Sequence, residues 1–166
     1  MSIKQALLES MNLELKVVKH LATKLKPTEA DYRPSAGQRT TLELLRYISY
    51  CAVVGTKYAL TGKWDDAKAL HEAADKHTLS EIPAALDREA AALSDLLAPF
   101  TDAKLLETDS ALPSGDKVKL LRALIDMPVK WLTAYKMQLF LYLKQSGHAE
   151  LSTPNLWRGT DPKPKA

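Results

Sequence analysis

Apolar residues recur every three or four positions along four segments of this chain, which is the period of an amphipathic helix. These segments begin at Ser2, Thr40, Thr78 and about Asp116, and the last one ends at Gly147. In each of the first three, a Ser or Thr is followed three residues later by Gln or Glu, the capping-box pattern of a helix start. No segment alternates apolar and polar residues clearly enough to predict a strand. The pattern therefore predicts an all-α protein built as a four-helix bundle.

Proline and glycine residues mark the connections between these segments. Pro27 and Pro99 follow the first and third segments, and the stretch Pro113-Ser114-Gly115 predicts a turn. Pro128 lies inside the last segment, where it predicts a kink or a restart of the helix. The connections at 61–77 and 99–116 are long, which indicates something other than a simple up-and-down bundle.

The chain after the last helical segment is interrupted by three prolines and Gly159, and it predicts a non-helical C-terminal tail. We expect Leu156 and Trp157 to fold back onto the bundle, because an exposed apolar pair lowers solubility. The sequence thus predicts one domain, with the bundle at 1–147 and the packed tail at 148–166. A chain of 166 residues is long enough for such a single core.

The charge and the apolar runs of the chain argue against nucleic-acid and membrane partners, and its cysteine count bears on the compartment. The net charge is +3, with 23 basic residues scattered among 20 acidic ones, and this balance does not indicate a nucleic-acid-binding protein. No apolar run reaches the roughly 18 residues of a membrane span, and no signal-peptide pattern begins the chain. The single cysteine, Cys51, excludes an intrachain disulfide and fits a reducing compartment. We therefore expect a cytoplasmic protein with no membrane partner.

Four short stretches stand out by their order and spacing along the chain. They are Tyr32-Arg33-Pro34, Arg39-Thr40-Thr41-Leu42-Glu43-Leu44-Leu45, Gly62-Lys63-Trp64, and the stretch from Gln138 to Gly147. Together they resemble the DinB-like superfamily, and the resemblance covers most of the chain. It implies a four-helix bundle that is often dimeric, so we expect a homodimer. Metal-binding members of that superfamily hold a divalent cation with three histidines, one on the second helix and two on the last.

The resemblance places the three histidine positions on Tyr47, Trp131 and Tyr135. Trp131 and Tyr135 are four residues apart and share one helix face, so the spacing of the ligand pair is kept. The chemistry is not kept, because an indole nitrogen only donates and a phenol with a pKa of about 10 must lose its proton to bind a cation well. We therefore expect no metal at these positions and no other cofactor.

Two interpretations of these three aromatic residues remain open. They fill the former site as core, as aromatic stripes at helical spacing usually do, or they line an altered pocket for a small molecule. Gln138 is a candidate for a hydrogen bond across the old metal site, and otherwise bonds between helices. Arg39 and Arg46 flank the start of the second helix and could bind an anion at the bundle mouth. Arg46, beside Tyr47, is the better candidate, with a surface ion pair as its alternative role.

Three further residues suggest a metal site elsewhere, namely His71, Asp75 and His77. His71 and His77 are six residues apart, which is neither helical-neighbour spacing nor a zincin pattern. If the segment is helical, His71 and Asp75 could share a face, but two ligands do not make a closed site. A solvated connection is the favoured interpretation. Cys51 lies mid-helix among apolar residues, with nothing nearby in sequence to lower its pKa, so a buried small side chain is favoured over a catalytic thiol.

The sequence thus predicts a DinB-like bundle without a metal triad, acting as a binding or structural module with an aromatic-lined centre. It shows no Gly-rich phosphate loop and no Ser- or Cys-His-acid arrangement, and it assigns no catalytic residue. The alternative, implied by the resemblance, is a thiol-dependent transferase or isomerase whose metal is relocated or absent. The residues alone do not name a ligand.

Overall fold

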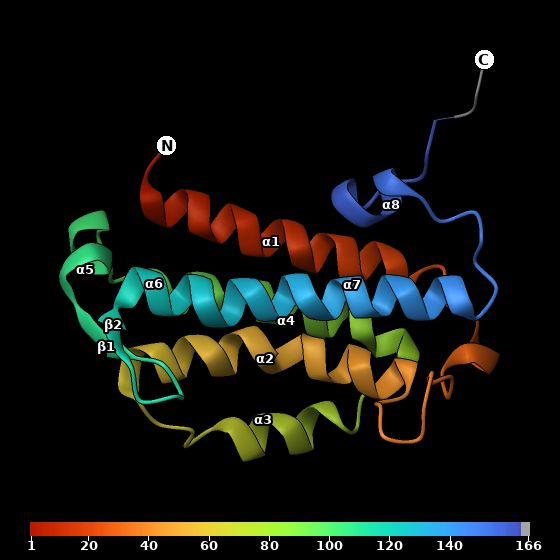
Figure 1. Ribbon diagram of the computed structural model, residues 1–166, viewed down its shortest axis with the longest axis horizontal. Helices are drawn as coiled ribbons and strands as arrows, with labels where there is room; N and C mark the ends of the chain where they lie inside the picture. Colours follow the sequence, from red (N-terminus) through yellow and green to blue (C-terminus); the bar gives the residue numbers. More distant parts are fainter. Residues whose placement is uncertain (164–166) are drawn as a thin grey trace.

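The computed structural model describes residues 1–163 and contains four long helical segments that run side by side (Figure 1). They are α1 (Ile3–Ala22), α2 (Thr41–Thr61), α4 (Ile82–Leu97), and a last segment of α6 (Leu120–Leu124), η3 (Ile125–Val129) and α7 (Lys130–Gln145). Each of α1 and α2 contacts both α4 and α7, so α1 and α2 occupy opposite corners of the bundle. The prediction of an all-α four-helix bundle is confirmed.

The connections between these helices carry shorter elements. They are η1 (Pro27–Glu29), α3 (Ala67–Ala74), η2 (Leu79–Glu81), α5 (Asp102–Glu107), β1 (Asp109–Ala111), β2 (Lys117–Lys119) and α8 (Thr153–Arg158). Of these, α3 lies against the outer side of α2 (Figure 1). The two long connections predicted from the sequence are thus present, and the first of them adds a helix to the bundle.

Local hydrogen bonds explain where the main helices begin. Ser2 Oγ accepts from the Gln5 amide, 3.1 Å away, at the start of α1. At the start of α2, Glu43 accepts from the Thr40 amide at 2.7 Å, and Thr40 accepts from the Glu43 amide at 3.2 Å. These caps satisfy donors that a helix start leaves free. Gly62 ends α2 with a φ of 70°, a left-handed conformation that glycine adopts without strain.

The last helical segment changes its winding at Pro128, where the sequence predicts a kink or restart. Residues Ile125–Val129 form one turn of π-helix, which joins α6 to α7 without a break in the helical path. Proline has no backbone N–H and cannot make the usual helical hydrogen bond, so the wider turn accommodates it. Asp126 on this turn forms ion pairs with Arg122 and Lys130.

A small hairpin was not predicted from the sequence. Strands β1 and β2 pair antiparallel, with Ser110 opposite Val118, and Ser110 Oγ donates to the carbonyl oxygen of Ala59 at 2.6 Å. The predicted turn at 113–115 connects them, and Gly115 has a φ of 91° there. Each strand has three residues, which is too short for an alternating pattern to appear.

The prediction of a non-helical tail is wrong for residues Thr153–Arg158, which form α8. A capping box between Ser152 and Asn155 starts this helix, and Pro154 in its first turn fits there because no N–H is needed. Asn155 and Leu156 are buried, and α8 packs on α1 and α7. Trp157 is 51% exposed, with its ring 4.4 Å from Lys136 Nζ.

No helix within residues 1–163 combines the length and apolar character that crossing a membrane requires.

Candidate functional site

Two of the three predicted site residues meet between α2 and α7. The rings of Tyr47 and Tyr135 pack edge to face with centroids 4.9 Å apart, and Tyr50 packs edge to face on Tyr47 at 5.4 Å. Tyr47 and Tyr135 are both half-buried. Two positions that the resemblance assigns to metal ligands, one on α2 and one on α7, are therefore in aromatic contact.

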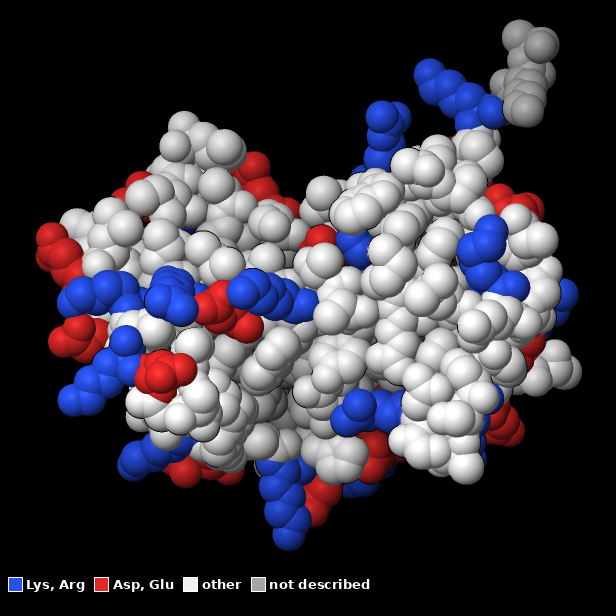
Figure 2. Space-filling model, in the orientation of Figure 1, with Lys and Arg blue, Asp and Glu red and all other residues white. Residues whose placement is uncertain are grey.

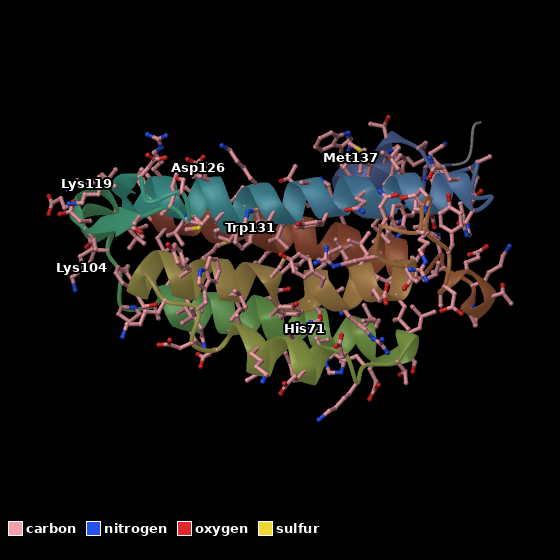
Figure 3. The ribbon with its side chains drawn as sticks, turned by 60° about the horizontal axis from the view of Figure 1, so that its bottom comes forward. His71, Lys104, Lys119, Asp126, Trp131 and Met137 are labelled. Carbon is pink, nitrogen blue, oxygen red and sulfur yellow. The ribbon has the colours of Figure 1, made fainter. Side chains whose placement is uncertain are left out.

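Trp131 takes a different role. Its ring lies between α7 and α2 (Figure 3), so close to Gly55 that a Cβ there would be 2.9 Å from Trp131 Cζ3. It also stacks on Trp64, with ring centroids 6.4 Å apart and planes inclined by 16°, and Trp64 in turn stacks on Tyr58 at 4.1 Å. Trp131 thus packs in the interface between α2 and α7.

A cavity of about 390 Å³ opens beside Tyr47. Tyr47 and Tyr50 of α2 form one wall, His71 and Asp75 come from α3 and its C-terminal cap, and residues 37–39 belong to the loop before α2. In Figure 3, His71 lies where α3 faces α2, which agrees with its contact with Tyr50. Tyr135 does not line this cavity, so the cavity extends outward from the aromatic contact toward α3.

The polar groups of the cavity are held by specific contacts. The guanidinium of Arg39 lies 4.1 Å from the Tyr47 ring centroid and makes no hydrogen bond or ion pair with another residue of 1–163. Tyr50 Oη is 3.0 Å from His71 Nδ1, and His71 Nε2 is 3.4 Å from Asp75 Oδ2. A carboxylate only accepts, so the His71 tautomer with its proton on Nε2 suits Asp75 and leaves Nδ1 able to accept from the Tyr50 hydroxyl.

Burial sets the protonation of the cavity wall. It raises the pKa of the Tyr47 phenol well above its usual range, and it also raises the pKa of Tyr50. The hydrogen bond from the Thr40 amide lowers the pKa of Glu43 at the cavity edge, so that carboxylate stays charged. The site therefore combines neutral phenols, carboxylates and the Arg39 guanidinium, which is unpaired within residues 1–163, and this set suits hydrogen bonding and charge recognition.

The residues at the three positions that the resemblance assigns to metal ligands do not fit a transition metal. Tyr47 holds its proton more strongly than a free phenol, and Trp131 offers a donor nitrogen on a ring packed against Gly55. Both ring nitrogens of His71 already face partners. Among the residues described, no three His, Cys, Asp or Glu side chains gather as a metal site would require.

The remaining candidates from the sequence lie outside the cavity. Gln138 Nε2 donates to Tyr142 Oη on the same helix at 2.7 Å. Arg46 Nε donates to the carbonyl oxygen of His77 at 2.8 Å and so ties α2 to the chain after α3. His77 Nε2 in turn lies 3.3 Å from an Arg88 nitrogen. Arg39, rather than Arg46, is the arginine at the cavity.

Sequence reasoning missed Tyr50 as a site residue. Its signal was its position three residues after Tyr47, which places both on one side of the helix. Cys51, one residue further, is fully buried, and burial raises the pKa of its thiol well above its usual range. A thiol in that state is a poor nucleophile, which agrees with the sequence-based expectation.

Comparisons with known proteins add the fold class. No family model matches this chain, and no curated protein matches it either. Among solved structures, it is similar to the crystal structure of YjoA, a DinB-like protein from Bacillus subtilis, with a TM-score of 0.66 and 19% sequence identity. The match covers 89% of this chain and 96% of that protein. The chain therefore has the DinB-like fold, as its sequence resemblance predicts.

Proposed function

We propose that this protein of DinB-like fold is a metal-free binding module whose small-molecule site is the cavity beside Tyr47. One observation carries the proposal: a cavity of about 390 Å³ joins two tyrosine rings to an arginine whose donors are free within the described chain. Ligand sites of about 300–1,000 Å³ commonly combine such walls with a few placed polar groups. The aromatic residues near the former metal site would then serve recognition on the Tyr47 side and packing on the Trp131 side.

The alternative is a thiol-dependent transferase or isomerase with a relocated or absent metal. We favour the binding module because the donor set at Tyr47, Trp131 and Tyr135 is unsuited to a cation, and His71 is engaged on both ring nitrogens. Cys51 is the sole cysteine, and its burial fits a protein kept in a reducing compartment such as the cytoplasm.

We also propose that the protein forms a homodimer through the outer face of α7 and α8. Leu141 is 48% exposed and Trp157 is 51% exposed on these elements. Charged side chains are sparse over the C-terminal half of α7, in contrast to the strip of Arg, Asp and Lys side chains over α6 and η3 (Figure 2). Depletion of charge around exposed aromatic and apolar residues is typical of an interface.

A cavity-blocking variant tests the binding proposal. A fragment library is screened by ligand-observed NMR against the wild type, and the hits are then measured on Gly37→Trp and Ala36→Trp. Gly37 lines the cavity and has nothing within 4 Å of an added Cβ, so a large side chain can enter the space without a backbone clash. Ala36 is exposed, does not line the cavity, and serves as the matched control.

We expect hits that bind the wild type and Ala36→Trp but lose at least tenfold in affinity on Gly37→Trp. Hits that bind Gly37→Trp as well as the wild type would contradict the proposed site. Elemental analysis of the purified protein tests the metal-free part, and a transition metal at one equivalent per chain would overturn it.

A further inference from the structure

We propose that the cavity beside Tyr47 recognises a small zwitterion, a molecule with a carboxylate and an amine like an α-amino acid. This inference rests on the proposed function and names the ligand class of the same site. It is drawn from the charges and free hydrogen-bonding groups that three different elements bring to the cavity. These elements are the loop before α2, α2 itself, and α3 with its C-terminal cap.

Arg39 supplies the positive side of the site. Its guanidinium carbon lies 4.1 Å from the Tyr47 ring centroid, and its N–H groups make no hydrogen bond within residues 1–163. A guanidinium presents several donors in one plane and matches the two oxygens of a carboxylate. A ligand carboxylate at this edge of the cavity would satisfy donors that the described chain leaves free.

Asp75 and Tyr50 supply the accepting side. Asp75 Oδ2 faces His71 Nε2 at 3.4 Å, which leaves Oδ1 free to accept. Tyr50 Oη lies 3.0 Å from His71 Nδ1. In the His71 tautomer with its proton on Nε2, the Tyr50 hydroxyl donates to Nδ1 and its oxygen can still accept from a ligand. An ammonium group carries three donors and no acceptor, and this pair of acceptors is complementary to it.

The balance of charge excludes simpler ligands. The cavity lining carries Arg39 as a cation against Glu43 and Asp75 as carboxylates, and Glu43 is already fixed by the Thr40 amide at 2.7 Å. A simple anion would meet two carboxylates, and a simple cation would meet Arg39 on the face of Tyr47. A zwitterion meets an opposite charge at each end, with its apolar part against the Tyr47 and Tyr50 rings.

Three matched probes test this inference by isothermal titration calorimetry at low salt. They are L-phenylalanine, L-phenylalaninamide, which lacks the carboxylate, and N-acetyl-L-phenylalanine, which lacks the amine. We expect L-phenylalanine to bind about fivefold or more tightly than either derivative, because each derivative leaves one charged side of the site unpaired.

Two variants assign the two ends of the ligand. Arg39→Gln should abolish the preference for L-phenylalanine over its amide and keep the preference over the N-acetyl form. Asp75→Asn should keep the preference for L-phenylalanine over its amide and abolish the preference over the N-acetyl form. Arg33→Gln and Asp65→Asn change the same charges on exposed residues outside the cavity lining and should keep both preferences.

The outcomes separate this inference from the proposed function. Equal affinities for the three probes, or tightest binding of the N-acetyl form, would overturn the zwitterion while binding in the cavity stands. The zwitterion proposal also fails if none of the three probes binds, although fragment hits bind the wild type and lose affinity on Gly37→Trp. If neither probes nor fragments bind at millimolar concentration, the proposed function fails as well.

Discussion

Glu89 of α4 is a carboxylic acid buried in the bundle, with 3% of its surface exposed. Its Oε1 accepts from the amides of Ala52 and Val53 on α2, at 2.8 and 3.3 Å, and its Oε2 has no partner within the described chain. Burial raises the pKa of Glu89 to about 8, from an ordinary value of 4.5. At neutral pH this side chain therefore stays protonated in the folded state.

Glu89→Gln should increase stability, and the gain should grow with pH. Between about pH 4.5 and 8 the folded wild type binds one more proton than the unfolded chain, so its free energy of unfolding falls as pH rises. The fall is at most about 1.4 kcal/mol per pH unit. Glutamine keeps the accepting oxygen and does not titrate, so urea unfolding at pH 5, 6.5 and 8 should show the variant gaining over the wild type.

The exposed Glu72 on α3 provides the control for this titration, since Glu72→Gln removes a carboxylate that water already solvates. That variant should follow the wild-type pH dependence. Parallel pH curves for Glu89→Gln and the wild type would show that Glu89 ionises normally in the folded protein.

Gly55→Ala should destabilise the protein, although alanine is normally the better helix residue. In an exposed helix the change gains about 1 kcal/mol. Here the added Cβ would be 2.9 Å from Trp131 Cζ3 and 3.2 Å from Cε3, and overpacking of this kind costs about 1–3 kcal/mol. Thermal and urea unfolding should therefore show a net loss of stability.

A second variant isolates the contact with the indole. In a Trp131→Leu background the ring atoms that oppose the new Cβ are gone, so Gly55→Ala should become neutral or stabilising there. A loss of the same size in both backgrounds would show that the helix interface at Gly55 tolerates no side chain for some other reason. From the sequence alone, Gly55 predicts only a weak point in the helix.

At the scale of the elements, His148 joins the end of α7 to the first loop. Its Nε2 lies 2.8 Å from Oε2 of Glu29, the last residue of η1, and its Nδ1 lies 3.1 Å from Glu150 Oε1. Burial alone lowers the pKa of His148, but the hydrogen bonds to the two carboxylates outweigh it and raise the pKa above 6.5. The same contact with His148 lowers the pKa of Glu29.

His148→Gln should lose stability mainly at low pH. A raised folded-state pKa means that the charged imidazole stabilises the fold below about pH 6.5 and that this contribution is lost as pH rises through the folded pKa. The difference in Tm between wild type and variant should therefore be large at pH 5.5 and small at pH 9. Glu29→Gln should reduce the same difference, and a Tm difference independent of pH would contradict a charged contact.

The starts of α1 and α2 were predictable from the sequence, and the shorter elements were not. The predicted start near Asp116 is wrong, because Lys117–Lys119 form β2 and α6 begins at Leu120. The capping of α2 lies within four residues, Thr40 to Glu43, so local pattern contains all the information it needs. In α8, by contrast, Asn155 also donates to His20 on α1 and to Asp161, at 3.1 and 3.0 Å. Six residues with long-range support show too little periodicity to be recognised in advance.

At the scale of the whole molecule, the site was predictable in part. The resemblance places Tyr47 and Tyr135 at corresponding positions on two helices, and the structure brings them into contact. The cavity also needs His71, which reaches Tyr50 only because α3 folds against the outer side of α2. Tyr50 and His71 are 21 positions apart, one in α2 and the other in α3, and no local spacing encodes their contact.

The proposed homodimer gives the last prediction, in which Leu141→Glu should convert a dimer to a monomer at micromolar concentration. Leu141 is 48% exposed on α7 within the proposed interface. A standard interface covers about 800 Å² of each partner, so a carboxylate at the centre of the interface would be buried without a counter-charge. Light scattering of the wild type and Leu141→Glu measures the mass of each in solution.

Leu106→Glu is the control. Leu106 is 49% exposed on α5 at the other end of the bundle, so this variant makes the same chemical change and should leave the mass unchanged. A monomeric wild type would refute the dimer, and equal dissociation by both variants would place the interface elsewhere.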